Sequence, residues 1–200
     1  MKRIAIMGSG NGSNFEAIVK YFSGKPDFAV DITCLSDNVN AYIIERAKNL
    51  GIKYKYLPFE QNGKYFAVNN FDLIVLAGYM RILPDDVLNL GKFINIHPSL
   101  LPSFKGKDAI YRAFEAGVKV SGVTIHYVTS DNDGGKIIAQ YPVLIGNLMH
   151  FDEFENEIHA VEHKLYPIVI EKLLKDEVFD FTDLVGSCSG NCSGGCAECH

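Results

Sequence analysis

The ten residues from Phe93 to Pro102, FINIHPSLLP, decide the fold and raise the first question about function. The stretch opens as a short, mostly apolar strand, and two prolines then stop it because proline cannot donate to a sheet ladder. Asn95 and His97 are two residues apart, so both project to the same side of an extended strand. At the carboxyl end of a central strand they could hold an oxyanion and transfer a proton; alternatively, His97 is satisfied by a backbone carbonyl beside a rigid turn.

Around this stretch, short β-rich runs alternate with amphipathic segments. Strands are predicted at 3–7, 30–35, 53–57 and 73–77 before 93–96, and a turn-rich loop should join two later strands, 120–128 and 136–143, as an antiparallel pair. Helices are predicted at 13–22, 41–50, 108–116 and 151–175, with Ser13 and Glu16 as a capping box and Pro167 as a kink or break. The alternation predicts an α/β fold: a doubly wound, mostly parallel sheet with an antiparallel edge pair.

Composition narrows the class of protein. The 200 residues suit one large domain or two small ones, and the net charge of −5 argues against nonspecific binding to nucleic acid. No apolar run approaches the roughly 18 residues of a membrane span. The apolar run at 4–7 is too short for a signal peptide, so we interpret it as the first strand and expect a cytoplasmic protein.

The loop GSGNGSN, residues 8–14, lies between the first predicted strand and the first predicted helix. Its glycines free backbone N–H groups to face a ligand, and the helix N-terminus adds partial positive charge, which together suit a phosphate. The dinucleotide fingerprint is incomplete because Ser13 replaces the third glycine, and no Lys-Ser/Thr pair completes a Walker loop. A plain tight turn is the structural alternative.

A second loop, TSDNDGG at residues 129–135, also offers chemistry. Asp131 or Asp133 could come close to His97 and favour its imidazolium form. Gly134 and Gly135 would let the chain pass close to a bound ligand. The structural alternative is a hairpin loop in which aspartate and asparagine have ordinary turn roles.

These features, in this order, resemble the phosphoribosylglycinamide formyltransferases, a family of folate-dependent enzymes of purine biosynthesis. The resemblance covers about residues 3–175 and rests on GSGNGSN, LAGYMRILP, INIHPSLLPSFKG, GVTIHYV with DNDGG, and EHKLYP. It implies a Rossmann-like formyltransferase fold and the transfer of a formyl group from 10-formyltetrahydrofolate to the amine of phosphoribosylglycinamide. It further implies a monomer or homodimer without a catalytic metal, a nucleic-acid partner or a membrane partner, and a catalytic domain at residues 1–185.

The resemblance also implies roles for individual residues. His97 matches the general acid, Asn95 the amide that supports the oxyanion, and Asp133 the aspartate that keeps His97 protonated. The substrate-binding residues that it implies are Gly10, Asn11, Gly12, Ser13, Asn14, His159 and Glu162. The cofactor-binding residues that it implies are Met80, Arg81, Ile82, Leu83, Asn95, Thr129, Ser130, Asp131, Asn132 and Asp133.

Some residues keep two interpretations. Arg81 is either part of the site or a surface salt-bridge partner. His126 either supports the site or is an ordinary core histidine. The segment 58–72 departs from the family pattern, because it is short where the family has an additional helix and Lys64 is its only basic residue. Whether this segment weakens ligand binding is a question that the sequence leaves open.

The last fifteen residues, GSCSGNCSGGCAECH at 186–200, have no counterpart in the family. Cys188, Cys192, Cys196 and Cys199 could hold zinc or an iron–sulfur cluster, or they could be free thiols in a flexible tail. Two rival functions stay open: formyl transfer to another amine, such as an amino-sugar nucleotide or an aminoacyl-tRNA, and a non-catalytic metal- or redox-responsive binding protein.

Overall fold

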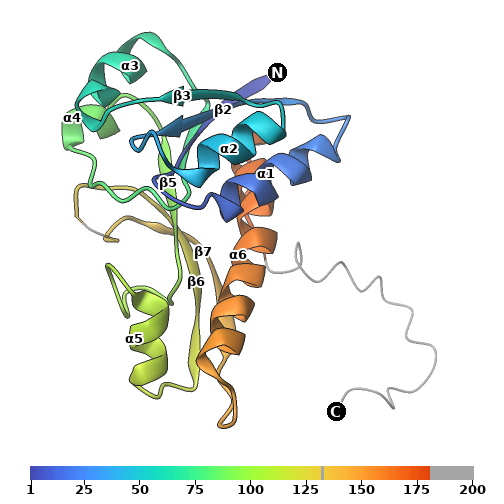
Figure 1. Cartoon of the computed structure of the whole chain (residues 1–200), viewed down its shortest axis with the longest axis vertical. Helices are drawn as coiled ribbons and strands as arrows, with labels where there is room; N and C mark the ends of the chain where they lie inside the picture. The colour runs from blue at the N-terminus through green and yellow to red at the C-terminus, as the bar shows by residue number, and fades with distance from the viewer. Residues whose placement is uncertain (132, 181–200) are drawn as a thin grey trace.

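Seven strands form a single sheet, and a computed structural model describes it within residues 1–131 and 133–180 (Figure 1). Their order across the sheet is β3-β2-β1-β4-β5-β6-β7. The five strands from β3 to β5 are parallel, and β6 runs antiparallel to both of its neighbours. The strands are β1 (Lys2–Met7), β2 (Val30–Ser36), β3 (Lys53–Tyr56), β4 (Leu73–Leu76), β5 (Phe93–His97), β6 (Val120–Tyr127) and β7 (Ile137–Leu144). The predicted doubly wound, mostly parallel sheet with an antiparallel edge pair is confirmed.

Helices cover both faces of the sheet. One core cluster joins it to α1, α2, α5 and α6, and a second cluster joins it to α3 and α4. In Figure 1, α6 follows β6 and β7 along their length. The helices are α1 (Ser13–Ser23), α2 (Tyr42–Asn49), α3 (Asn62–Val68), α4 (Asp85–Leu88), α5 (Ala109–Glu115) and α6 (Phe151–Leu174), with a 3₁₀ turn, η1 (Phe59–Gln61), before α3.

The side chains of β1 explain why both faces are covered. Ile4 and Ile6 belong to the first core cluster, whereas Ala5 and Met7 belong to the second. Successive residues of a strand point to opposite faces, so an uninterrupted apolar strand requires a core on each side.

The strand order reverses between β1 and β4, which places the crevice of an open α/β sheet between the loops that follow them. Ser9 ties these two loops together: its N–H donates to the Gly78 carbonyl over 3.0 Å, and its hydroxyl accepts from the Met80 N–H over 3.0 Å. Tyr166 of the EHKLYP motif is fully buried and donates to the carbonyl of Leu76 over 2.9 Å. The motif tyrosine thereby attaches α6 to the end of β4.

The capping box predicted for the first helix is wrong. Gly12, not Ser13, is the N-cap of α1, and no side chain caps this helix. Gly12 has a φ of 77°, and a Cβ there would lie 2.6 Å from Ile43, so only glycine fits the turn. Glu16 pairs with Lys20 and Arg46 instead of closing a capping box.

Pro167 does not break its helix, because α6 continues across it to Leu174. Pro167 is buried, and the packing of α6 against the sheet outweighs the one backbone hydrogen bond that a proline removes. The short segment 58–72 does contain a helix, α3, which its length did not suggest. Phe66 explains why it folds, since its ring meets those of Phe71 and Phe93 at 6.2 and 5.5 Å between centroids.

Glu171 joins α6 to α1 through a buried carboxylate. It accepts hydrogen bonds from Tyr21 and Lys25 and, over 2.7 Å, from Lys175. Burial alone raises the pKa of this carboxyl, but the contacts with Lys175, Lys25 and Tyr21 outweigh it and lower the pKa from 4.5 to about 2. A carboxylate whose folded pKa is depressed stabilises the fold above its unfolded pKa and loses that effect as the pH falls through its folded pKa.

Glu171→Gln is therefore expected to lower the free energy of unfolding by about 2 kcal/mol at pH 7. The difference from wild type should shrink as the pH falls from 4.5 to about 2, where the wild-type carboxyl also becomes neutral. Urea unfolding across this range measures it, with the exposed Glu157→Gln on the same helix as the control. A difference that stays constant with pH would contradict the assignment.

Candidate active site

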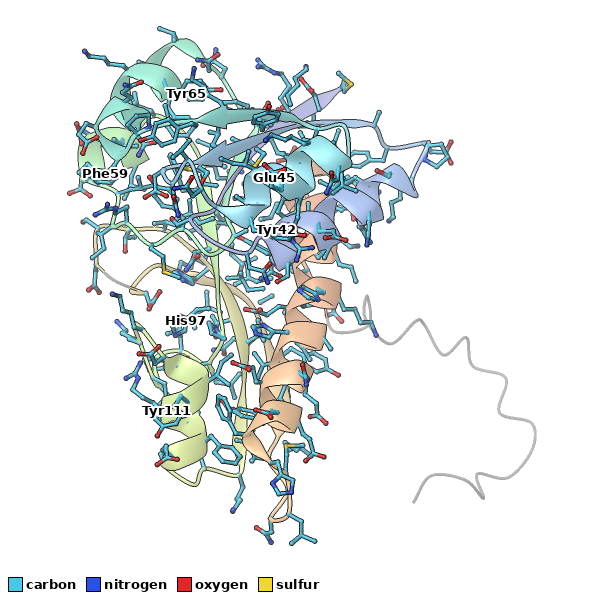
Figure 2. All side chains as sticks on the ribbon, in the orientation of Figure 1. Tyr42, Glu45, Phe59, Tyr65, His97 and Tyr111 are labelled. Carbon is cyan, nitrogen blue, oxygen red and sulfur yellow. The ribbon has the colours of Figure 1, made fainter. Side chains whose placement is uncertain are left out.

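A cleft of about 550 Å³ opens at the carboxyl ends of β4 and β5. Asn95, His97 and Asp133 line it together with the loop after β4, including Met80, Arg81 and Ile82. Pro98 and the residues Gly106, Lys107, Asp108 and Ala109 close its other side. Figure 2 shows His97 between the strands and α5. The cleft thus gathers the three predicted catalytic residues and three more of the predicted cofactor-binding residues.

His97 and Asp133 form the polar centre of the cleft. The His97 side chain is 6% exposed, and its Nδ1 lies 3.4 Å from Oδ2 of Asp133. Its Nε2 lies 3.0 Å from the carbonyl oxygen of Phe104. Both ring nitrogens therefore face acceptor oxygens, an arrangement that the imidazolium form satisfies because both of its nitrogens donate.

His126 contacts the same carboxylate from β6. Its Nε2 lies 3.6 Å from Oδ1 of Asp133 and 3.3 Å from the side-chain nitrogen of Asn95. Its Nδ1 donates to the carbonyl of Tyr127 over 2.9 Å, which fixes the ring orientation. The register of the sheet explains this position, because Asn95 and His126 are paired residues of β5 and β6. His126 supports the two residues that line the cleft, an interpretation that the sequence alone left open.

Asp133 is ionised in this setting. Its side chain is 8% exposed. Burial alone raises the pKa of the carboxyl, but the contacts with His126, with the Gly106 N–H and with the charge of His97 outweigh it and lower the pKa from 3.8 to about 2. The Gly106 N–H donates to Oδ2 over 2.8 Å. A buried carboxylate with these partners stays negative at neutral pH.

The two glycines after Asp133 serve the fold of their own loop. A Cβ on Gly134 would lie 2.0 Å from the Asp131 carboxylate, and a Cβ on Gly135 would lie 1.6 Å from the Tyr127 carbonyl. Asp133 itself has a φ of 53°, a conformation that aspartate tolerates better than most residues. The glycines therefore turn the chain so that Asp133, and not Asp131, faces His97.

A smaller cavity of about 70 Å³ adjoins the cleft and shares Asn95, Asp133, Arg81 and Ile82 with it. Leu83 and Thr129 line only this smaller cavity. Tyr79 lines both spaces and was missed by the sequence analysis, although it lies inside the LAGYMRILP motif. Its hydroxyl accepts from the buried Asn62 over 3.0 Å, and burial raises its pKa to about 12.

Two residues of the loop after β4 expose large apolar side chains. Met80 is 69% exposed and Ile82 is 62% exposed, and both lie at the cleft. Arg81 lines the cleft and also forms a salt bridge with Asp37 over 3.3 Å, so both of the interpretations that the sequence left open apply to it. An apolar wall with a few fixed polar groups is typical of a site for a planar organic ligand.

The loop at 8–14 is held by hydrogen bonds from α2, just before α1 begins. Arg46 donates to the carbonyl and the side-chain oxygen of Asn11, each over 2.8 Å, and Gly10 accepts from the Ile43 N–H over 3.0 Å. The first N–H groups of a helix have no intrahelical partner, and no side chain caps them here. The loop therefore presents free N–H groups from Ser13 to Phe15, beside the ion pair of Arg46 and Glu16.

α6 brings two more selected residues to this loop. Glu162 is 4% exposed and accepts from the Asn14 side-chain amide over 3.3 Å and from His159 Nδ1 over 2.9 Å. The hydrogen bond with Glu162 raises the pKa of His159. The structure thus unites Asn14, His159 and Glu162, which are far apart in the sequence.

The remaining selected residues are not in the cleft. Ser130 and Asp131 are exposed and line neither cavity, and Asp131 instead pairs with Lys105 over 3.8 Å. They belong to the outer face of a loop whose inner face carries Asp133. Asn132 and the four tail cysteines lie outside the described residues. Within the described ranges, no three His, Cys, Asp or Glu side chains are grouped so that they could hold a metal ion, and no helix is long and apolar enough to cross a membrane.

Comparison with known proteins agrees with this fold and site. The sequence model of a family described as Formyl transferase matches residues 2–170, so the chain belongs to the formyl transferase family. The phosphoribosylglycinamide formyltransferase of Bacillus subtilis is 43% identical over 186 residues, which cover 87% of this chain and 95% of that protein.

Solved structures agree with the sequence comparison. The crystal structure of phosphoribosylglycinamide formyltransferase from Bacillus halodurans has a TM-score of 0.78 at 39% identity and covers 86% of this chain and 95% of its own. Glycinamide ribonucleotide transformylase 1 from Symbiobacterium toebii has a TM-score of 0.82 at 31% identity, with coverages of 90% and 95%. Within its family, the chain therefore belongs with the phosphoribosylglycinamide formyltransferases.

Proposed function

We propose that this chain transfers a formyl group from 10-formyltetrahydrofolate to the amine of phosphoribosylglycinamide, with His97, Asn95 and Asp133 as the reacting centre. One observation carries this proposal: Asn95 and His97 face one cleft from β5, and the buried Asp133 carboxylate lies 3.4 Å from His97. Formyl transfer needs two oriented substrates, a donor for an oxyanion and a proton relay. The cleft has a side chain for each of the last two roles.

The reaction proceeds through a tetrahedral intermediate. The amine nitrogen attacks the formyl carbon, a C–N bond forms, and the carbonyl electron pair moves onto oxygen. The Asn95 amide donates to this oxyanion, and the positive charge of a protonated His97 stabilises it where the charge develops. When the bond from the formyl carbon to the folate N10 breaks, N10 gains a proton and the amine nitrogen loses one, so His97 can relay the proton and end the cycle protonated.

The folate is proposed to occupy the cleft and the adjoining cavity. Met80 and Ile82 offer exposed apolar surface for its ring system, and Leu83 and Thr129 extend this wall into the smaller cavity. Asn95 and Asp133 lie where the two spaces meet, which suits a formyl group presented between them. The proposed ligand contacts of Ser130 and Asp131 would come from the outer part of their loop.

The ribonucleotide is proposed to bind along α1, with its phosphate at the N–H groups of Gly12, Ser13 and Asn14. Free N–H groups at a helix start and the adjacent Arg46 support an anion there. Gly10 and Asn11 shape the approach to this subsite. The carboxylate of Glu162, held by His159 and Asn14, suits an amine or hydroxyl donor on the same substrate.

Substitutions at β5 test the reacting centre. His97→Ala is expected to lower kcat by roughly 10²–10⁴-fold, the usual loss for a general acid, and Asn95→Ala by roughly 10²–10³-fold. A spectrophotometric assay with both substrates measures kcat, and circular dichroism confirms the fold. Wild-type protein that folds but transfers no formyl group, or that prefers another amine in a substrate panel, would overturn the assignment.

The phosphate subsite has its own test. Inorganic phosphate is expected to compete with phosphoribosylglycinamide and not with the folate. Gly12→Ala should raise the KM for the ribonucleotide by roughly tenfold or more, because its Cβ would collide with Ile43 and displace the N–H groups. Gly63→Ala, whose Cβ meets only an ordinary contact at 3.8 Å, is the control. Phosphate inhibition that competes with the folate would place the anion elsewhere.

We also propose that residues 1–185 form the catalytic domain, active in the cytoplasm as a monomer or homodimer, and we test the tail at 186–200 as a zinc or iron–sulfur site against the alternative of free thiols. The family match at 2–170 supports the domain, and the spacing of Cys188, Cys192, Cys196 and Cys199 supports the tail site. A chain that ends at Val185 should keep wild-type kcat in the formyl-transfer assay and contain no metal in elemental analysis. Light scattering of both forms measures the oligomeric state. Equal metal content in the two forms would exclude the tail site.

A further inference from the structure

Arg112 holds the loop that borders the cleft between β5 and α5. It is exposed, and its guanidinium donates to the carbonyl oxygens of Phe104 over 2.9 Å, of Lys107 over 3.0 Å, and of Lys105. A planar guanidinium with five fixed donors can bind several carbonyls at once, whereas an ammonium group acts as a point charge. One side chain therefore binds three of the five residues from Phe104 to Asp108. This loop has no regular secondary structure.

The backbone of this loop needs such support. Phe104, Gly106 and Asp108 have φ values of 53°, 83° and 55°, which places all three in the left-handed region. Glycine adopts this region freely, but residues with a Cβ are disfavoured there. Such conformations persist where the surrounding structure holds them, and they gather at functional sites.

The same loop holds both members of the polar centre. The Phe104 carbonyl accepts from His97 Nε2 over 3.0 Å, and the Gly106 N–H donates to Asp133 over 2.8 Å. Arg112 donates to the same Phe104 oxygen that His97 uses. The position of that oxygen, and with it the orientation of the imidazole, therefore depends on Arg112.

We propose that Arg112 is a positioning residue for the reaction: it fixes the loop Phe104–Asp108 so that the Phe104 carbonyl orients His97 and the Gly106 N–H orients Asp133. The catalytic part of this inference rests on the proposed function of His97, whereas the structural part does not. Arg112 itself does not line the cleft, so it acts through the loop and not on a substrate. Arg112 lies outside the sequence motifs that carry the family resemblance.

Arg112→Ala is expected to lower kcat by roughly 10–100-fold while the KM values of both substrates stay within roughly twofold of wild type, because misorienting a reacting group slows the chemical step without removing binding contacts. Arg112→Lys should recover only part of the lost kcat, since an ammonium cannot bind the three carbonyls together. Because Arg112 is exposed, both variants are expected to fold, which thermal unfolding checks.

Nitrogen NMR of the histidine side chains gives a readout that a general loss of stability would not change. In the wild type, the hydrogen on His97 Nε2 is bonded to the Phe104 carbonyl and should exchange slowly with solvent. In Arg112→Ala this signal should broaden or disappear, while the His126 Nδ1 signal, bonded to Tyr127, should persist. His97→Gln assigns the signal.

Arg3→Ala is the matched control, because Arg3 pairs with Asp31 and lies over the Phe71 ring away from the cleft. It should leave both kcat and the His97 signal unchanged. If either kcat or the His97 signal of Arg112→Ala remains at the wild-type level, the proposal is overturned. A wild-type protein without formyl transfer would reject the proposed function instead, and the His97 signal alone would then decide whether Arg112 orients the imidazole.

Discussion

The active-site architecture depends on giving a buried carboxylate enough partners. Asp133 is 8% exposed, and burying an ionised group without compensation is costly. Its partners come from β5, from β6 and from the loop before α5: His97, His126 and the Gly106 N–H. Three separate parts of the chain must therefore meet at one group. Together these partners outweigh the effect of burial and lower the pKa of Asp133 to about 2.

The reversal of strand direction at β5 makes this meeting possible. A parallel neighbour on one side continues the doubly wound sheet, whereas β6 on the other side runs antiparallel, so that its last residue, Tyr127, pairs with Ile94 near the start of β5. Asn95 then pairs directly with His126, and the glycine-rich turn returns Asp133 toward His97. The loops after β1 and β4, which Ser9 joins, lie on the other side of β5 from β6.

Much of this could be predicted from the sequence because the signals are local. Short β-rich runs located all seven strands, and the period of a strand placed Asn95 and His97 on one side. The predictions that failed or were missing involve distant partners. Glu16 left its expected capping box for Arg46, α3 formed because Phe66 meets the ring of Phe93, and His126 acquired a role through its register with β5.

The sequence by itself determined the strands, the proline stop after His97, and the side that Asn95 and His97 share, because these follow from geometry within a few residues. It also carried the motifs of the family to which the chain belongs. The family resemblance implied Asp133 as the partner of His97, but only the tertiary structure showed that the two side chains lie 3.4 Å apart and that Arg112 binds the loop that contacts both. A buried charge and a left-handed loop are stable only with particular partners, and those partners become neighbours only when the sheet has formed.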